Sequence, residues 1–551
     1  MVVPEPKVWR AARPHVVRVA RAVKPGVVRL SRAVKPGAER VARVVKPGVV
    51  RVTSAVSARS SQLAGNTKKL TTLQFTAGAA TLGLVLSAGA VAAAGPWDSS
   101  GQRTAERDRA ASPAGQGGAD HGRDPGMSAE APKPAPSALS VLTGLGAGAA
   151  QAGAGSAPES AALAAVLDPF LNSPDLGPRP AAAVVDVATG RQLYGQNADD
   201  ALTPASTTKI ATAAAVLSAA GPDHRIETRT VLKPDSAEVV LVGGGDPTLT
   251  AREEAGGHAS LRALADRTAA ALAERHLDEI TLTYDTSLYE GPELHSIGVD
   301  GNIAPVTALM VDEARLDDST SGTTTRSTDP AGDATAKFAD LLADRGVKTE
   351  ATGPLPDSSR ATADTEELAS VSSPPLSALV ERMLTHSDND LAEALARQVA
   401  VATDEPASFE GGAAAIKKQL KKLGLPLDGV EFADGSGLSR DNQLTADLLT
   451  ALLAESAAPS HPELRPVLTG LPVAGFTGTL SSRYATQPDG TGVVRAKTGT
   501  LTGVNTLAGT VVDADGRLLA FAVLATGATD RTAAHKALDA AASALATCGC
   551  R

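Results

Sequence analysis

Apolar residues gather in short β-prone runs near both ends of the part of the chain that follows residue 156. Two such runs, 181–187 and 191–197, flank an Ala-Thr-Gly turn, which predicts a β-hairpin. Three further strands are predicted near the C-terminus, at residues 493–497, 506–512 and 517–525. Two early and three late strands, with helical segments between them, predict an antiparallel sheet built from both ends of the folded part.

Helices are expected between and after these strands. The segments concerned are residues 206–220, 260–276, 335–345, 375–386, 390–401 and 531–547. Pro204 suits the first position of the helix that carries Ser206, because proline lacks the N–H that a helix start leaves unpaired. One more apolar run, 237–242, predicts a strand that ends at the glycine-rich stretch 243–247.

The first 155 residues carry a different pattern. An 11-residue repeat runs from residue 11 to residue 54, with its period marked by Pro14, Pro25, Pro36 and Pro47. Each proline removes a backbone donor and clashes with the preceding turn, so one continuous helix is not expected. Two interpretations remain open: short Val/Arg amphipathic segments on an anionic membrane face, or a disordered basic tail.

An uncharged stretch follows at residues 75–94, directly after Lys68 and Lys69. About 20 residues can just span a bilayer as a helix, and the positive charge predicts that its N-terminal side stays cytoplasmic. We therefore expect a single-pass anchor in the cell membrane with an extracellular folded part. The stretch also resembles a signal-peptidase site near Ala94, and cleavage there would give a secreted protein.

Net charge separates the chain into two parts. Residues 1–70 hold 16 Lys or Arg and two acidic residues, a net charge of +14, although the whole chain carries −9. A basic head on an acidic body indicates two environments rather than one domain. Cys548 and Cys550 are the only cysteines. They are too few for a disulfide framework, and we expect two surface thiols rather than a Cys-Gly-Cys bridge.

Three short motifs contain residue types that catalysis uses. Ser206 and Lys209 are one helical turn apart and share a face, which places an amine beside a hydroxyl that needs a base to become a nucleophile. The amine can act as that base only if burial or nearby positive charge lowers its pKa. Alone, this spacing is equally that of an N-capping serine followed by an exposed lysine.

The other two motifs lie downstream. Ser387-Asp388-Asn389, between two predicted helices, offers a second hydroxyl that can relay a proton and an amide that can hold a substrate carbonyl. Lys497-Thr498-Gly499-Thr500, on a predicted strand, offers positive charge, hydroxyls for a carboxylate and a glycine that lets substrate approach the backbone. Each of them alone is an ordinary loop, cap or strand.

Together and in this order, the three motifs form the signature of serine β-lactamases and penicillin-binding proteins. The 181 residues from Ser206 to Ser387 exceed what a compact β-lactamase places there. The sequence resembles the D-alanyl-D-alanine carboxypeptidase/endopeptidase family known as penicillin-binding protein 4 or DacB, peptidase family S13. Further matching stretches are residues 204–209, 243–249, 373–376, 434–440, 478–480 and 496–501.

The resemblance spans about residues 160–547 and implies an α/β (α+β) fold. This fold has a β-lactamase/transpeptidase-like antiparallel sheet flanked by helices, with a large inserted region between the first and second motifs. The expected organisation is a basic repeat segment at 1–70, a transmembrane anchor or signal at 71–96, a disordered linker at 97–155, a penicillin-binding catalytic domain at 156–235 and 366–551, and one or more inserted domains at 236–365.

The same resemblance implies the role of each candidate residue. Catalytic roles are implied for Ser206, Lys209, Ser387, Asn389 and Lys497, and substrate binding for Thr498, Gly499 and Thr500. Ser206 would be the nucleophile and acyl-ester site, and Lys209 its general base. The backbone N–H groups of Ser206 and Thr500 would form the oxyanion hole.

The expected activity is hydrolysis of the terminal D-Ala–D-Ala bond of peptidoglycan stem peptides, with D-amino-acid cross-links as further substrates. β-Lactams are expected as covalent inhibitors, and no metal, organic cofactor or nucleic-acid partner is expected. A β-lactamase or D-amino-acid esterase on the same fold remains an alternative, as does a non-catalytic wall-binding scaffold. A third alternative is that the basic repeat is the main function, as a tether to the membrane or to a partner, which could hold alongside the enzyme.

Overall fold

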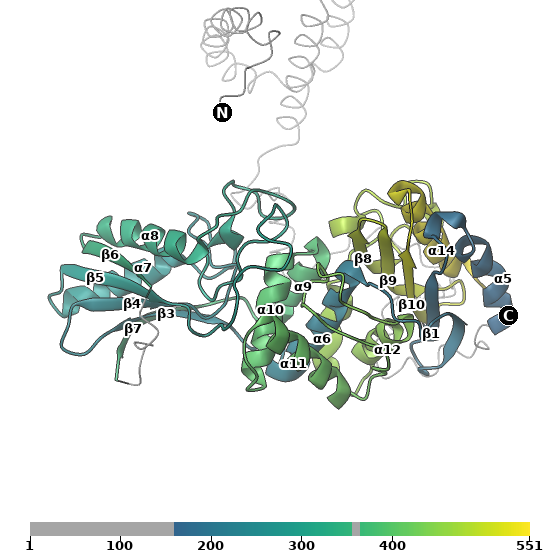
Figure 1. The fold of residues 1–551 in the computed structure, drawn as a ribbon, viewed down its shortest axis with the longest axis horizontal. Helices are drawn as coiled ribbons and strands as arrows, with labels where there is room; N and C mark the ends of the chain where they lie inside the picture. Colours follow the sequence, from purple (N-terminus) through teal and green to yellow (C-terminus); the bar gives the residue numbers. More distant parts are fainter. Residues whose placement is uncertain (1–158, 355–363, 551) are drawn as a thin grey trace, which may run out of the picture. The chain divides into compact units, whose positions relative to one another are not determined.

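The structure, a computed structural model, describes residues 159–354 and 364–550 (Figure 1). The basic repeat, the apolar stretch 75–94 and the linker lie outside these residues, so the expectations for them stay predictions. Among the helices that the structure describes, none combines the length and apolar character that crossing a membrane requires.

The first sheet has five strands in the order β2-β1-β10-β9-β8, and every neighbouring pair is antiparallel. Its strands are β1 (Ala181–Asp186), β2 (Gln192–Gln196), β8 (Arg495–Leu501), β9 (Val504–Val512) and β10 (Leu518–Thr526). The central pair β1 and β10 joins the early hairpin to the late strands. The expected antiparallel sheet with strands from both ends of the folded part is therefore confirmed.

Side chains of the first sheet alternate between two apolar layers. Ala181 and Ala183 on β1 belong to one core, whereas Ala182 and Val184 belong to the other, because successive residues of a strand point to opposite faces. Helices α5 (Ser160–Leu171) and α14 (Arg531–Thr547) cover the second core (Figure 1). The sequence analysis expected α14 but not α5.

A group of helices covers the other face. It consists of α6 (Thr208–Ala220), α9 (Leu376–His386), α10 (Asn389–Ala402), α11 (Phe409–Lys422), α12 (Ala446–Ala457) and the short α13 (Arg465–Thr469). Helix α6 is buried on all sides from Thr208 to Leu217, including the polar side chains of Thr208, Lys209 and Thr212. This central helix follows directly after Ser206.

A second sheet of five strands, with the order β6-β5-β4-β3-β7, forms the inserted region. Strands β4, β5 and β6 run parallel, and β3 pairs antiparallel with both β4 and β7. The bounds are β3 (Glu227–Leu232), β4 (Glu238–Val242), β5 (Glu279–Asp285), β6 (Lys348–Pro354) and β7 (Glu366–Ser372), with α7 (Leu261–Glu274) and α8 (Pro330–Ala343) packed on the sheet.

This sheet extends beyond the expected bounds of 236–365 at both ends. Strand β3 leads the chain into the inserted region and β7 leads it out, and the two strands lie side by side in one antiparallel pair. Both strands lie in segments that were expected to belong to the catalytic domain. Their pairing keeps entry and exit close together, as an insertion into an existing fold requires.

Cys548 and Cys550 form a disulfide, and both are buried. The expectation of two surface thiols was therefore wrong. The short tail after α14 folds back on the second core, where the carbonyl of Cys550 accepts a hydrogen bond of 3.0 Å from the N–H of Glu159. This contact places the tail beside the start of α5 and takes both sulfur atoms out of solvent.

Candidate active site

Ser206 lies on a short helical turn at the start of the buried helix α6. The 3₁₀ turn Ala205–Thr207 precedes α6, so the α-helix begins two residues later than expected. Ala205 has a φ of 49°, in the left-handed region that residues with a Cβ rarely adopt. The hydroxyl of Thr506 on β9 donates a 2.8 Å hydrogen bond to the carbonyl of Pro204 and ties this turn to the first sheet.

Lys209 is fully buried, and its Nζ faces three oxygen atoms. These are Oγ of Ser206 at 3.0 Å, Oδ1 of Asn389 at 2.6 Å and the backbone carbonyl of Ser436 at 2.6 Å. An ammonium group has one N–H for each of these acceptors. A neutral amine keeps two donors, enough for Asn389 and Ser436, and turns its lone pair toward the Ser206 hydroxyl. The geometry therefore suits proton transfer from hydroxyl to amine.

Burial lowers the pKa of Lys209 to about 8, although the negative charges of Asp434 and Glu393 act in the opposite direction. A solvated lysine has a pKa of about 10.4. A substantial fraction of Lys209 is consequently neutral under mildly alkaline conditions. Lys209 can therefore act as a base, because burial has lowered its pKa.

A second buried lysine faces a second serine. Nζ of Lys497 donates hydrogen bonds to Oγ of Ser387 at 2.7 Å and to the carbonyl of Thr498 at 2.9 Å. Burial, followed by the positive charge of Lys209, lowers the pKa of Lys497 well below its ordinary value. Because the two amines repel each other, a proton gained at one favours release of a proton at the other.

The second motif is shaped by the junction of two helices. Ser387 has a left-handed φ of 58° at the end of α9, and the Asp388 side chain accepts a 3.0 Å hydrogen bond from the N–H of Leu391 and caps α10. Asn389, the first residue of α10, faces Lys209 with its side-chain oxygen. Its Nδ2 donates to the carbonyl of Asn302 at 3.0 Å, which connects the motif to the inserted region.

The two threonines of the third motif have separate partners. Oγ1 of Thr498 donates to Oγ1 of Thr479 at 2.8 Å. Oγ1 of Thr500 lies 3.3 Å from Nε2 of His535 on α14. Burial, together with the positive charges of Arg483 and Arg531, lowers the pKa of His535 to about 4, so this ring is neutral at physiological pH.

Gly499 packs against the turn that carries Ser206. A Cβ added at Gly499 would lie 2.7 Å from the carbonyl oxygen of Pro204 and 2.1 Å from Oγ1 of Thr506. We expected this glycine because it lets substrate approach the backbone. The structure adds a packing reason, since only glycine allows β8 to lie this close to the Ser206 turn.

The structure brings the candidate residues into two contact groups. One joins Ser206, Lys209 and Asn389, and the other joins Ser387 and Lys497. Strand β8 connects them, because Gly499 touches the turn of the first group and lies two residues after the lysine of the second. Positions up to 302 residues apart in the chain meet here.

The loop at residues 434–442 is a part of the site to which the sequence analysis gave no role. The carboxylate of Asp434 accepts from two backbone N–H groups of its own loop, from the side chain of Asn442 and from the ring of His295. These bonds hold the loop from which the Ser436 carbonyl accepts the hydrogen bond of Lys209. The matching stretch 434–440 was a signal, but only the fold shows what it contacts.

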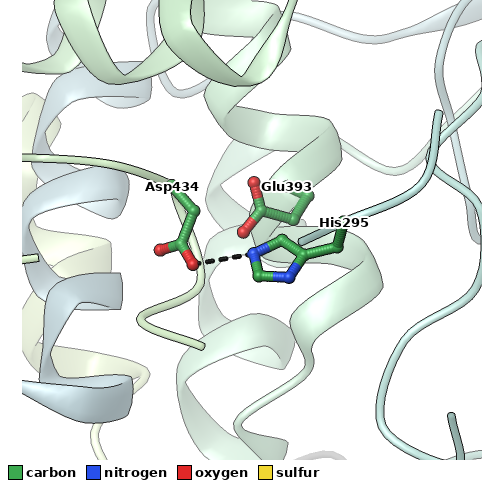
Figure 2. A group of neighbouring side chains, drawn as sticks. All are labelled: His295, Glu393 and Asp434. Atoms are coloured by element: carbon green, nitrogen blue, oxygen red, sulfur yellow. Dashed lines mark hydrogen bonds and ion pairs between the residues drawn. The ribbon is translucent and has the colours of Figure 1, made fainter. Parts of the chain in front are cut away.

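His295, Glu393 and Asp434 form a buried group whose nitrogen and oxygen atoms lie within 4.8 Å of one another (Figure 2). One imidazole and two carboxylates are a donor set that divalent metals use. However, the Glu393 oxygens already accept the N–H groups of Gly435 at 3.1 Å and Ser436 at 2.8 Å. With Asp434 also fully bonded, the group is a hydrogen-bonded hub, and we assign no metal to it.

A cavity of about 370 Å³ opens between the inserted region and the 434–442 loop. Its residues are Ser296, Ile297, Asp300 and Asn302 on one wall, Leu438, Ser439, Arg440 and Asp441 on the other, and Leu501 after Thr500. Charges of both signs line it. Because Asn302 contacts Asn389, the cavity adjoins the contact group that contains Ser206, and Leu501 places it next to Thr500.

A second buried charge cluster supports the motif at Ser387 from the side of the inserted region. The Glu313 carboxylate pairs with Arg315 at 2.8 Å and with Arg382 on α9 at 2.6 Å, while Arg326 pairs with Asp390 at 2.8 Å. Burial, and then the nearby charge of Asp388, raise the pKa of Glu313 to about 7. Residues 312–314 all have φ near 54°, a strained left-handed run that these buried pairs hold in place.

The fold and this arrangement agree with comparisons to known proteins. The model of the D-Ala-D-Ala carboxypeptidase 3 (S13) family matches residues 163–321 and 315–548. The chain belongs to this family and is therefore a serine-type D-Ala-D-Ala carboxypeptidase.

Individual relatives support the assignment. Carboxypeptidase DacB of Mycolicibacterium smegmatis is 38% identical over 439 residues, which cover 77% of this chain and 91% of the relative. The D-alanyl-D-alanine carboxypeptidase of Actinomadura sp. strain R39 is 29% identical over 436 residues, covering 66% and 80%. Penicillin-binding protein 4 (dacB) from Haemophilus influenzae has the same fold, with a TM-score of 0.58 at 22% identity over 71% of this chain and 99% of that one.

Proposed function

We propose that the chain hydrolyses the terminal D-Ala–D-Ala bond of peptidoglycan stem peptides through an acyl-enzyme on Ser206. The observation that carries this proposal is the 3.0 Å contact between Ser206 Oγ and the fully buried Nζ of Lys209. Lys209 accepts the hydroxyl proton as Oγ attacks the carbonyl carbon of the scissile bond. Asn389 and Ser436, which accept the other two hydrogen bonds of Lys209, hold the amine next to the hydroxyl during the reaction.

The leaving amine of D-alanine needs a proton when the C–N bond breaks. We propose that Ser387 relays this proton to the amine nitrogen, with the Lys497 amine at 2.7 Å replacing the proton that Ser387 gives up. Before water attacks, the proton that Lys209 took from Ser206 passes to the now neutral Lys497, so that both amines return to their starting states. Water then attacks the Ser206 ester with Lys209 as base, and Ser206 regains its hydroxyl proton.

Substrate recognition in this proposal falls to strand β8. Lys497 provides positive charge and the hydroxyls of Thr498 and Thr500 bind the terminal carboxylate. The backbone N–H groups of Ser206 and Thr500 stabilise the oxyanion, where each donor of this kind contributes about 3–4 kcal/mol in well-studied hydrolases. D-amino-acid cross-links carry the same carbonyl and a similar leaving amine, so endopeptidase activity is part of the proposal.

β-Lactams resemble the substrate and are proposed as covalent inhibitors at Ser206. A solved penicillin-binding protein 4 from Haemophilus influenzae, 23% identical and with a TM-score of 0.53, is in complex with a β-lactam. In the present chain, the acyl-enzyme would form by opening of the lactam ring, with the ring nitrogen receiving the proton.

The decisive experiment is labelling with fluorescent penicillin. Wild-type protein should be labelled covalently, and Ser206→Ala should not be. Ser481→Ala, at an exposed serine, is the matched control and should be labelled like the wild type. Persistent labelling of Ser206→Ala would sink the assignment, and rapid turnover of the label would favour a β-lactamase. Product analysis on a defined cross-linked muropeptide separates carboxypeptidase from endopeptidase activity.

We also propose that residues 75–94 anchor the chain in the cell membrane and that the catalytic part faces outward, where its substrate is. The 20 uncharged residues and the preceding basic segment support this. Protease added to intact cells should then degrade the catalytic part. Deletion of residues 1–67 tests the basic repeat: a tether predicts a changed cellular distribution with unchanged penicillin labelling, and an unchanged distribution would count against a tether.

A further inference from the structure

His295, in the inserted region, contacts both the 434–442 loop and a residue that lines the cavity next to the Ser206 group. Its Nε2 lies 2.9 Å from Oδ2 of Asp434, the first residue of the 434–442 loop (Figure 2). Its Nδ1 accepts a 3.3 Å hydrogen bond from the backbone N–H of Ile297, which lies two residues further along the same segment and lines the cavity. One imidazole ring therefore bridges the inserted region and the loop that provides the Ser436 carbonyl to Lys209.

These two contacts define the protonation state of the ring. Nδ1 accepts a hydrogen bond and so carries no proton, which leaves the proton on Nε2, where it is donated to Asp434. A doubly protonated ring would keep the Asp434 contact but would point an N–H at the N–H of Ile297. The ring is buried and meets the edge of Phe409 at 5.3 Å, so it has little room to turn away.

The surroundings of His295 are dominated by carboxylates. The charged residues around it, from all the elements that pack on this cluster, are Asp434, Glu393, Asp300, Arg397 and Lys209. Burial alone would lower the pKa of His295, but the hydrogen bond to Asp434 and the charge of Glu393 raise it above its usual value. A second proton thus binds at a higher pH than it does to a solvated histidine.

We propose that His295 is a positioning residue that, in its neutral form, fixes the cavity-lining backbone of Ile297 relative to the 434–442 loop, and that a second proton on the ring breaks the contact with Ile297. The kinetic part rests on the proposed function. A stem peptide that is held at Ser206 and extends into the cavity touches both walls. A loosened wall therefore weakens binding of the long substrate and leaves the chemistry at Ser206 largely intact.

Substrates of two lengths test this role. For His295→Ala, which loses both contacts, we expect KM for a stem pentapeptide ending in D-Ala–D-Ala to rise about tenfold, the effect of one or two hydrogen bonds. In His295→Gln, which keeps an N–H donor for Asp434, the kcat, the KM for acetyl-D-Ala–D-Ala and the rate of acylation by penicillin should each change by less than about threefold. His224→Gln, at an exposed histidine, is the matched control and should behave as the wild type.

The pH profile separates this role from a merely structural one. As the pH falls, the wild-type KM for the pentapeptide should rise, because His295 takes up its second proton. His295→Gln keeps a neutral N–H donor toward Asp434 and cannot titrate, so its KM should lack that rise. The proposal is overturned if His295→Gln keeps the wild-type pH dependence, or if His295→Gln slows penicillin acylation by more than about threefold.

A measurement that does not need activity completes the test. Nitrogen-15 NMR of the histidine side chains reports the tautomer, and the His295 signal is the one lost in His295→Gln. We expect the neutral ring to carry its proton on Nε2, and a proton on Nδ1 would overturn the proposal. A wild-type protein that penicillin does not label contradicts the proposed function instead, and the NMR result then decides about His295 alone.

Discussion

The Nζ atom of Lys497 donates a 2.7 Å hydrogen bond to Oγ of Ser387, which lies 110 residues earlier in the chain. Among the described residues, this is the only hydrogen bond that Lys497 donates to a hydroxyl group. We therefore expect Ser387→Ala to slow penicillin acylation of Ser206 by about 10²–10³-fold, the usual contribution of a positioned proton donor. Stopped-flow acylation kinetics measure it. A variant within threefold of the wild type would remove Ser387 from the relay.

The rate of acylation should depend on the protonation of Lys209. Only the neutral amine can accept the Ser206 proton, and burial lowers the pKa of Lys209 to about 8. Acylation should therefore be slow below this pH and rise as the pH increases through about 8, which a pH profile of the penicillin acylation rate measures. A rate that falls over this range would contradict a lysine base.

The corresponding substitution is Lys209→Arg. The guanidinium of arginine stays protonated at any workable pH, with a pKa above about 12, so this variant should show no acylation from pH 6 to pH 10. Lys536→Arg, at an exposed lysine on α14, is the control and should keep the wild-type profile. Residual acylation of Lys209→Arg with an unchanged profile would point to another base.

Glu313 should be important for stability because it is buried among arginines. Removing its carboxylate in Glu313→Ala leaves Arg315 and Arg382 without this partner, which should cost about 3–5 kcal/mol of unfolding free energy. Glu431→Ala removes a carboxylate from an exposed pair with Lys417 and should cost about 0–1 kcal/mol. Urea denaturation measures both. Equal losses would show that the buried cluster adds nothing.

Gly499→Ala should disturb the site without unfolding the protein. The new methyl group would press on the Pro204 carbonyl and on Thr506, and so displace the turn that carries Ser206. We expect penicillin acylation to fall by at least about tenfold, since small displacements of reacting groups are costly. Gly516→Ala, in the remote turn between β9 and β10 with open space around it, should acylate normally. Unimpaired acylation of Gly499→Ala would show that this contact can relax.

Much of the fold could be predicted from local patterns. The hairpin of β1 and β2, the helix after Ser206 and the strands β8 to β10 all follow from apolar runs and turn residues, and the structure has them within a few residues. Strands β3 and β7 were missed, since each is mixed in polarity and is stabilised by its partner strands. Cys548 and Cys550 were misjudged because their burial depends on packing against α5, an element that the sequence analysis had not predicted.

The candidate site, like the fold, could be predicted only where local spacing connects its residues. Ser206 and Lys209 share a helical turn, so local spacing was enough to pair them. The Ser436 carbonyl that receives Lys209 is 227 residues away in sequence, and His295 and Asp434 are 139 residues apart. No period or spacing connects such positions. Asn389 and Lys497 were found through the motifs alone, and their contacts needed the fold.

The first sheet contains strands from both ends of the folded part, so the active site cannot assemble until the last of these strands has been synthesised. Strand β1 pairs with β10, and at their shared edge Asp186 and Arg517 are joined although 331 residues separate them. A ribosome adding about 5–20 residues per second needs on the order of half a minute to cover that interval. Ser206 is made near its beginning and Lys497 near its end, so a nascent chain stalled before β8 should bind no penicillin. The active site is thus incomplete until strands β8 to β10 have been made.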